Sequence, residues 1–444
     1  MDKQNHQPAA IGLCVPSNER PSFGAGASLL PSTFRCPRLR LCAKTRGMES
    51  SAASDSELAL SANAPSVGIG ATARVPWFIS TVVFGATCIL YGIIWDISWH
   101  STIGRDTFWT PAHLLIHLGG SLAGFCCGWL VLKTTFRGTS AERAASVRVW
   151  GFRGPLGAWV TIWGALAMIA SAPFDNWWHD AYGLDVKILS PPHSVLAAGM
   201  YFVVVGVLLL VVSLQNRSAG TSRAAGGKLF VYAGGIILAM ATIMVTELSL
   251  PNLQHAALYY QVSCPLYVSL MVTFARASKL RFPATAAAAI YMGLMLAMMW
   301  LLPLFAATPK LAPIYNPVTR MVPEAFPHWL IVPAVAMDLL LLALGRGRGW
   351  RRDLLLVGTM STAFVALFVP VQWFFAKFYL SPTADNWFFG GSRYWSYMAQ
   401  PGQWRQQFWE TQSDPLTVKS LAIAWLLALL AHSSGWRGAT GWRK

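Results

Sequence analysis

Charged side chains are scarce in this chain: they account for 12% of its 444 residues, whereas 55% are hydrophobic. A soluble globular protein needs a larger polar fraction to cover its surface, so the composition excludes that class and places the chain in a lipid bilayer. A hydrocarbon core about 30 Å thick requires about 20 apolar residues per helix. Ten segments satisfy this requirement: 75–97, 111–132, 155–174, 191–213, 229–250, 255–275, 284–307, 326–344, 354–376 and 417–433.

Cysteine is also scarce, with seven residues and no Cys-x-x-Cys pair, which excludes a disulfide framework. We expect no cleavable signal peptide, because the first apolar run begins only near Val75. The preceding residues, 1–72, are rich in Ser, Ala, Pro and Arg without periodicity. They predict a disordered cytoplasmic tail.

Acidic residues are fewer than basic ones, 18 against 34, which gives a net charge of +16. Eighteen of the basic residues cluster in alternate loops between the predicted helices, at 133–153, 217–228, 276–281, 346–352 and 437–444. This distribution follows the positive-inside rule and places both termini in the cytoplasm. We therefore expect a multi-pass protein of the cell (inner) membrane, in contact with lipid, and no nucleic-acid partner.

Ten helices joined by basic cytoplasmic loops make five hairpins that open to the outer, periplasmic side. The predicted fold is an all-α, polytopic transmembrane helix bundle. Its first four helices, in residues 73–215, carry the motifs described next. The remaining six helices, in residues 216–444, form a membrane region to which the sequence assigns no role.

The first two outward turns repeat one pattern. In each copy an Asp precedes a His by four residues, a second Asp follows that His by six, and a Pro-x-His opens the next helix. The first copy consists of Asp96, His100, Asp106 and His113, and the second of Asp175, His179, Asp185 and His193. Chance is a poor explanation for so many shared polar positions in a mostly apolar chain. The later turns are weaker versions, with Glu247 and His255 in one, and His328 and Asp338 in the other.

The spacing within each copy suits a metal ion. Residues four apart lie on one face of a helix, so Asp96 and His100 can converge on one ion. His113 opens the adjacent helix of the hairpin and returns a third ligand to the same depth. One carboxylate and two imidazoles suit Cu(II), Zn(II) or non-haem Fe(II), whereas Mg²⁺ and Ca²⁺ prefer more oxygen ligands.

An Asp near the hydrocarbon region costs about 2.5 to 3.5 kcal/mol on insertion scales, so such a residue usually has a partner or marks a functional path. We expect Asp106 and Asp185 to accept hydrogen bonds from the free N–H groups of the histidines. They are alternatively paired with Arg105 and Lys187. The competing interpretation of both turns contains no metal: each Asp caps or binds a His, and the basic residues balance the charge.

The segment from Asp96 to His113 resembles the signature of the C subunit of particulate methane monooxygenase and ammonia monooxygenase. That signature reads Asp-x-x-Trp-His, then Arg-Asp-Thr, then Thr-Pro-x-His, and the step of thirteen residues from His100 to His113 matches it. The second copy is similar to the other metal site of the same subunit, with Asp175 where that family has Asn. The resemblance covers about residues 80–215.

In that family these positions bind copper in the membrane subunit of a three-subunit enzyme, which hydroxylates methane, short hydrocarbons or ammonia with O₂. The resemblance therefore implies up to two copper ions, one at Asp96, His100 and His113 and one at Asp175, His179 and His193. It also implies partner membrane subunits, or association with itself. Zinc and iron stay open as alternatives. The six helices after residue 215 have no counterpart in that subunit.

Two functions of different class follow. The first is a component of a copper-dependent monooxygenase that uses O₂ and a small apolar substrate or ammonia. The second is a non-catalytic membrane protein that binds, stores or transfers copper or zinc. A transporter that keeps the motif as a structural element is a weaker third interpretation.

Overall fold

The computed structural model describes residues 75–183, 190–217, 220–345, 349–409 and 414–441. The predicted tail, and Asp185 and Lys187 of the second outward turn, lie outside the described residues. The description below concerns the unit that begins at Ile69.

All ten predicted helices are present, which confirms the all-α polytopic fold. They are α1 (Trp77–Thr102), α2 (Pro111–Arg137), α4 (Leu156–Tyr182), α5 (Pro191–Arg217), α6 (Gly220–Met244), α7 (Ala257–Ala277), α8 (Pro283–Leu301), α9 (Ile331–Leu344), α10 (Trp350–Tyr379) and α11 (Val418–Gly441). Eight of them are long and apolar enough to cross a membrane, while α9 and the apolar part of α11 are shorter. Between α2 and α4 lie the short helix α3 (Ser140–Ala144) and a hairpin of β1 (Val147–Val149) and β2 (Phe152–Gly154).

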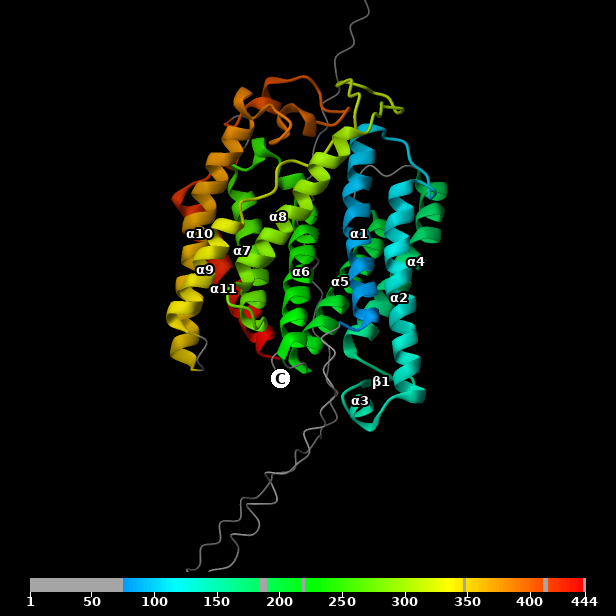
Figure 1. Cartoon of the computed structure of the whole chain (residues 1–444). Helices are drawn as coiled ribbons and strands as arrows, with labels where there is room; N and C mark the ends of the chain where they lie inside the picture. Colours follow the sequence, from blue (N-terminus) through cyan, green and yellow to red (C-terminus); the bar gives the residue numbers. More distant parts are fainter. Residues whose placement is uncertain (1–74, 184–189, 218–219, 346–348, 410–413, 442–444) are drawn as a thin grey trace, which may run out of the picture. The chain divides into compact units, whose positions relative to one another are not determined.

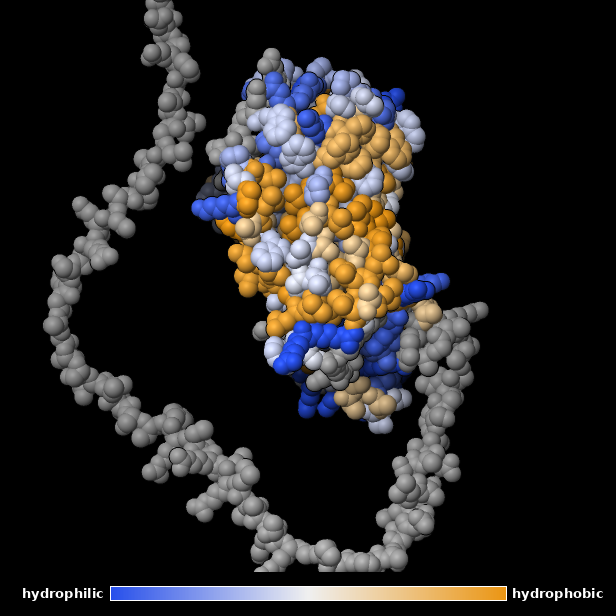
Figure 2. Space-filling view, turned by 90° about the vertical axis from the view of Figure 1, so that its left-hand side faces the viewer, coloured by the Kyte–Doolittle hydropathy of each residue, from blue (hydrophilic) through white to orange (hydrophobic). Residues whose placement is uncertain are grey.

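Large apolar side chains cover the outside of the helices. Phe84 of α1 is 56% exposed and Phe125 of α2 is 78% exposed. Figure 2 shows that such side chains form a hydrophobic band between two hydrophilic ends. A surface of this kind is unfavourable in water and favourable against lipid tails, so the chain is a multi-pass membrane protein.

The first two predicted hairpins are tightly packed. In α1 and α2, a side chain at Gly85 would collide with the carbonyl of Gly119, and one at Gly119 with the carbonyl of Gly85. Gly164 of α4 and Gly199 of α5 approach each other in the same reciprocal way. Small residues let membrane helices pack backbone against backbone, so the two helices of each pair lie in close contact.

The six later helices pair less simply. Helix α7 packs mainly against α11, and α6 packs mainly against α8 and α5, so α6 and α7 are not each other's main partners. Helix α9 packs on α10 and α8. In Figure 1, α6 and α8 lie between the group of α1, α2 and α4 and the group of α7, α9, α10 and α11.

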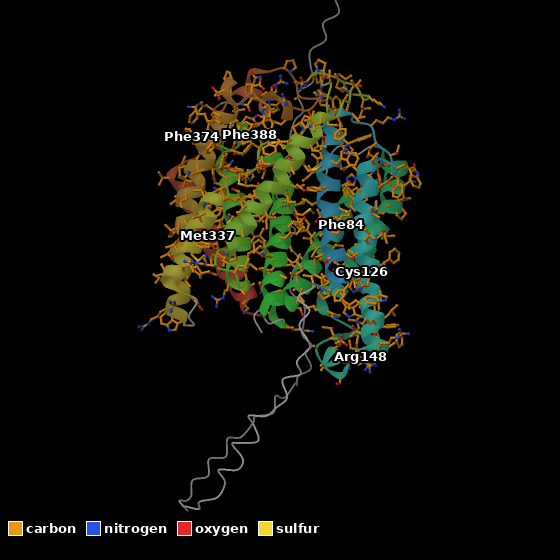
Figure 3. The ribbon with its side chains drawn as sticks, viewed as in Figure 1. Phe84, Cys126, Arg148, Met337, Phe374 and Phe388 are labelled. Atoms are coloured by element: carbon orange, nitrogen blue, oxygen red, sulfur yellow. The ribbon has the colours of Figure 1, made fainter. Side chains whose placement is uncertain are left out.

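The two ends of the bundle differ in character. The turn between α1 and α2 and the long segments after α8 and α10 gather at one end (Figure 1). Figure 3 shows Phe388 at that end and Arg148, from the basic segment after α2, at the opposite end. The structure therefore separates the two kinds of loop as the alternating charge pattern requires. Which end faces the periplasm remains a prediction.

Candidate metal centre

Asp96, His100 and His113 converge at the end of the first helix pair. Asp96 and His100 occupy the last two turns of α1, and His113 lies in the first turn of α2. One potential ligand atom from each residue lies within 4.8 Å of the others, so the three could hold a metal ion. His113 Nε2 lies 2.9 Å from Asp96 Oδ1, and His100 Nε2 lies 3.9 Å from the same oxygen.

Asp106, in the turn between the helices, lies inside this cluster. Its Oδ2 is 3.4 Å from His100 Nε2 and 3.5 Å from His113 Nε2. It therefore faces the same ring nitrogens as Asp96, which differs from the expected position behind the histidines. Burial raises the pKa of the Asp106 carboxyl, but the hydrogen bond to His100 and the charges of His100 and His113 outweigh it. The net pKa lies below its ordinary value, so Asp106 is an anion at neutral pH.

The turn between α1 and α2 fixes the orientation of His113. Thr110 precedes Pro111, the first residue of α2, and its hydroxyl accepts a hydrogen bond from the N–H of Thr107. The carbonyl of Thr107 lies 2.9 Å from His113 Nδ1. A carbonyl oxygen only accepts, so Nδ1 carries the proton and the Nε2 of neutral His113 presents a lone pair. Metal-binding histidines are commonly oriented by such a bond.

With this tautomer, His113 Nε2 and Asp96 Oδ1 are two acceptors that face each other. A lone pair and a carboxylate oxygen 2.9 Å apart do not attract each other, so positive charge must lie between them. That charge is either a second proton on His113 or a bound cation. Ligand atoms of a tetrahedral ion with bonds of about 2.1 Å stand about 3.4 Å apart. The four contacts, between 2.9 and 3.9 Å, are centred on that spacing, so these residues could hold a metal ion.

Arg105, predicted as a partner of Asp106, is exposed. Its backbone carbonyl accepts a hydrogen bond from Trp99 Nε1 over 2.9 Å. This bond joins the last turns of α1 to the turn that carries Asp106. Arg105 thus supports the shape of the turn through its backbone.

The second copy of the motif is arranged similarly but is more open. Asp175 and His179 lie near the end of α4, and His193 lies in the first turn of α5. Asp175 Oδ1 is 3.8 Å from His179 Nε2 and 3.4 Å from His193 Nε2. Among the described residues, only the first trio has all three ligand atoms within 4.8 Å of one another.

Three hydrogen bonds from the later part of the chain hold the end of α1. The N–H of Val322 donates to Thr102 Oγ1 over 2.8 Å, that of Lys310 to the Ile103 carbonyl over 2.9 Å, and that of Tyr397 to the Ser101 carbonyl over 3.0 Å. Gly104, with φ of +82°, completes this junction, because a side chain there would collide with Tyr397. The sequence contains no local pattern that predicts these contacts. The segments that follow α8 and α10 therefore contact the end of α1, next to the candidate ligand His100.

The weaker turns do not reproduce the trio. Glu247 is exposed, whereas His255 is buried and packs against Phe408, with ring centroids 4.8 Å apart. Asp338 binds the start of α8, where it accepts hydrogen bonds from Ala284 N, Thr285 N and Thr285 Oγ1. It therefore caps a helix of the bundle. His328 is buried in a separate polar cluster, described below.

Comparison with protein-family models, with curated proteins and with solved structures finds no match to this chain. The resemblance to the monooxygenase C subunit rests on the spacing of the two motifs. The geometry of the first motif adds a possible metal site to that spacing.

Proposed function

We propose that this membrane protein binds copper at Asp96, His100 and His113, with Asp106 beside them, and a second ion at Asp175, His179 and His193. Zinc and iron are the alternative ions that this donor set accepts. The observation that carries the proposal is the short contact between His113 Nε2 and Asp96 Oδ1, because the Thr107 carbonyl fixes the His113 proton on the other nitrogen. A bound cation removes the conflict between the two facing acceptors.

We further propose that the protein is a component of an O₂-dependent hydroxylase of small apolar substrates or ammonia. The support is the resemblance of both motifs to the monooxygenase C subunit. A copper ion with open coordination positions would supply the activation of O₂. The residues of this chain would orient the site: Thr107 holds the His113 ring, and Asp96 and Asp106 supply negative charge. Partner membrane subunits or further copies of the chain would complete the enzyme.

A second candidate function is non-catalytic binding, storage or transfer of copper or zinc. The exposure of the ligands favours it: the side chains of His100 and His193 are 45% and 35% exposed. A site that passes an ion to another protein needs such access, whereas a catalytic site benefits from exclusion of water. The two functions share the same ligands and differ in the need for O₂.

Elemental analysis of detergent-purified protein tests the metal sites. We expect His100→Ala and His179→Ala each to lose about one ion per chain, and the double variant about two. His117→Ala is the matched control: His117 lies one turn after His113 on α2, and its ring packs on Phe108 with centroids 5.4 Å apart. Metal content that is the same in all variants would overturn both candidate functions.

A second experiment separates catalysis from storage. Membranes that contain the protein and its partner subunits are supplied with ammonia or a short alkane, with and without O₂. Oxygen-dependent product that disappears in His100→Ala supports the hydroxylase. Metal that passes to an acceptor protein, without product under any condition, supports storage or transfer.

A further inference from the structure

After the short 3-10 helix η3 (Leu302–Leu304), the connection between α8 and α9 enters the bundle as irregular backbone. Met321, Val322, Phe326 and His328 are buried in this segment, at 5%, 3%, 5% and 2% exposure. Irregular backbone is stable among apolar helices only where its polar groups have partners. Side chains of distant helices provide them: the N–H of His328 donates to Tyr291 Oη over 2.9 Å, and that of Trp329 to Gln372 Oε1 over 2.9 Å.

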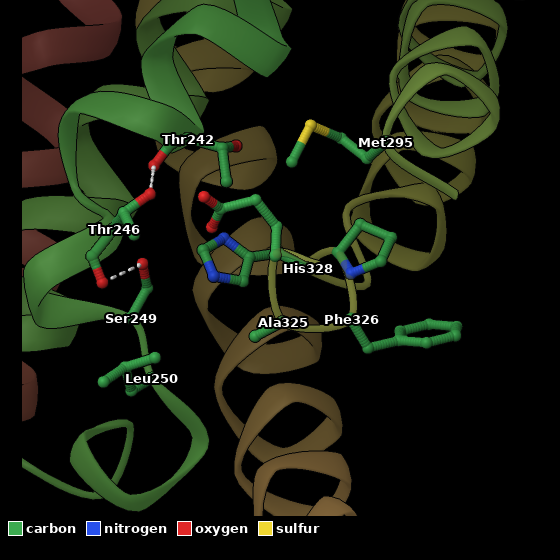
Figure 4. Close-up of a pocket in the computed structure, with 10 residues that line it drawn as sticks. Thr242, Thr246, Ser249, Leu250, Met295, Ala325, Phe326 and His328 are labelled. Carbon is green, nitrogen blue, oxygen red and sulfur yellow. Dashed lines mark hydrogen bonds between the residues drawn. The ribbon is translucent and has the colours of Figure 1, made fainter. Parts of the chain in front are cut away.

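A small cavity lies where this segment meets α6 and α8 (Figure 4). Its volume is about 20 Å³, which is room for one water molecule. The polar groups that line it are Glu324, His328, Thr242, Thr246 and Ser249. A polar cavity of this size, with several hydrogen-bonding side chains, meets the conditions for a bound water.

A chain of hydrogen bonds fixes the proton on His328. The Thr242 hydroxyl donates to the Leu238 carbonyl over 3.0 Å and lies 3.0 Å from Tyr267 Oη. Tyr267 Oη lies 2.8 Å from His328 Nδ1. Because the Thr242 proton is used on a carbonyl, Tyr267 donates to Thr242, and His328 Nδ1 must donate to Tyr267. His328 Nε2 is then left as an acceptor.

Glu324 and His328 are the two ionisable groups that line the cavity. Burial alone raises the pKa of the Glu324 carboxyl to about 7. The titratable groups on the neighbouring helices are the phenols of Tyr259 and Tyr267 on α7 and of Tyr291 on α8. Glu247, on the turn after α6, is exposed and does not line the cavity.

Burial lowers the pKa of His328 to about 3, so its imidazole is neutral. The other hydroxyls that line the cavity donate to carbonyls, Thr246 to Thr242 over 3.5 Å and Ser249 to Val245 over 2.6 Å. Glu324 in its acid form is therefore the side chain of the cavity that can donate to His328 Nε2.

We propose that this cavity is a proton-binding site, in which the Glu324 carboxylic acid holds one exchangeable proton and donates it in a hydrogen bond toward the acceptor nitrogen Nε2 of His328. When the Glu324 carboxylic acid ionises, its proton passes to solvent and leaves a carboxylate beside a neutral imidazole. Uptake of one proton from solvent restores the acid. No electron is transferred. The site uses none of the metal-binding residues and is independent of the proposed function.

Infrared difference spectroscopy of the full-length protein in detergent tests this site. We expect the carbonyl band of a protonated carboxylic acid to titrate with a midpoint near pH 7, and to be absent in Glu324→Gln. His328→Gln should shift the midpoint, because the imidazole that accepts the hydrogen bond from Glu324 is removed. Glu247→Gln is the matched control, since Glu247 is an exposed glutamate in the neighbouring turn, and this variant should retain the band unchanged.

Two outcomes would overturn the proposal. One is the absence, in wild type, of a carboxylic acid band that titrates near neutral pH, or a band that persists unchanged in a Glu324→Gln variant that unfolds at the same temperature as wild type. The other is loss of the band when sodium chloride replaces choline chloride at constant pH and ionic strength. That result would assign the cavity to a monovalent cation in place of a proton.

Discussion

The N–H of Val322 donates a hydrogen bond to Thr102 Oγ1 over 2.8 Å, and this bond joins two residues that are 220 positions apart in the sequence. Thr102 lies two residues after the metal-ligand candidate His100, and Val322 lies two residues before the cavity residue Glu324. The end of α1 is thus held by the same segment that forms the buried polar cavity. This relationship leads to the first prediction.

Thr102→Val should weaken both folding and metal binding. The substitution keeps the shape of the side chain but removes the acceptor, so the buried N–H of Val322 loses its partner, at a cost of about 1–3 kcal/mol. Thermal unfolding and a metal titration measure the two effects. Thr81→Val is the control, because the Thr81 hydroxyl makes the same bond to its own helix and lies far from the centre along α1. Equal behaviour of the two variants would argue against a positioning role for Thr102.

Asp96→Asn should reduce metal affinity more than Asp106→Asn. Both changes remove one negative charge and keep the side-chain size, but Asp96 lies on α1 at 2.9 Å from His113 Nε2, whereas Asp106 is 3.5 Å from it. Binding of the metal by wild type should also weaken as pH falls, because protons compete for the imidazoles. Competition with a chromophoric chelator at several pH values measures the affinity of each variant and the pH dependence of wild type. A larger loss in Asp106→Asn would make Asp106 the principal carboxylate ligand.

Asp175→Asn should change which ion the second site prefers. This substitution restores the residue that the resembled family carries at this position, and it removes a negative charge that favours divalent ions. We expect weaker binding of Cu(II) and Zn(II), with Cu(I) binding little changed. Parallel titrations with the three ions test this. The prediction fails if all three affinities fall by the same factor.

The stability of the protein should depend on pH through Glu324. The folded-state pKa of this carboxyl is raised from 4.5 to about 7, so the folded protein retains a proton that the unfolded chain has lost. The bound proton stabilises the folded state fully at pH values below 4.5, the ordinary pKa of glutamate. This stabilisation is lost as the pH rises through about 7. The unfolding temperature of wild type should fall as the pH is raised from 4.5 to about 7, and that of Glu324→Gln should fall less. Parallel curves for the two proteins would contradict the raised pKa.

The local hydrophobic pattern was sufficient to predict that the helices exist. It failed to predict two helix boundaries: one where polar residues extend a helix, and one where an apolar segment lies outside the helix. The predicted span 75–97 stops at the polar residues of the motif, whereas α1 continues through His100 to Thr102. The predicted span 326–344 begins too early, because Pro327 and His328 belong to the irregular buried segment and α9 begins at Ile331. In both cases tertiary contacts decide the boundary.

The candidate site was predictable where its residues are close in sequence. Helical spacing places Asp96 beside His100, and the hairpin brings His113 to them. The position of Asp106 depends on the path of a short turn, which spacing does not determine. The contacts of Val322, Lys310 and Tyr397 with the end of α1 come from segments more than two hundred residues away, so they follow only from the packing of the whole bundle.

These distant donors have a consequence for the order in which the protein matures. A nascent chain that ends at Arg217 already contains both motifs, yet it lacks all three groups that bind Ser101, Thr102 and Ile103. The last turn of α1 reaches its final set of bonds only after Tyr397 has been synthesised. A chain that is released before that point keeps the bond from Trp99 to Arg105, but the end of α1 that carries His100 lacks these three later bonds.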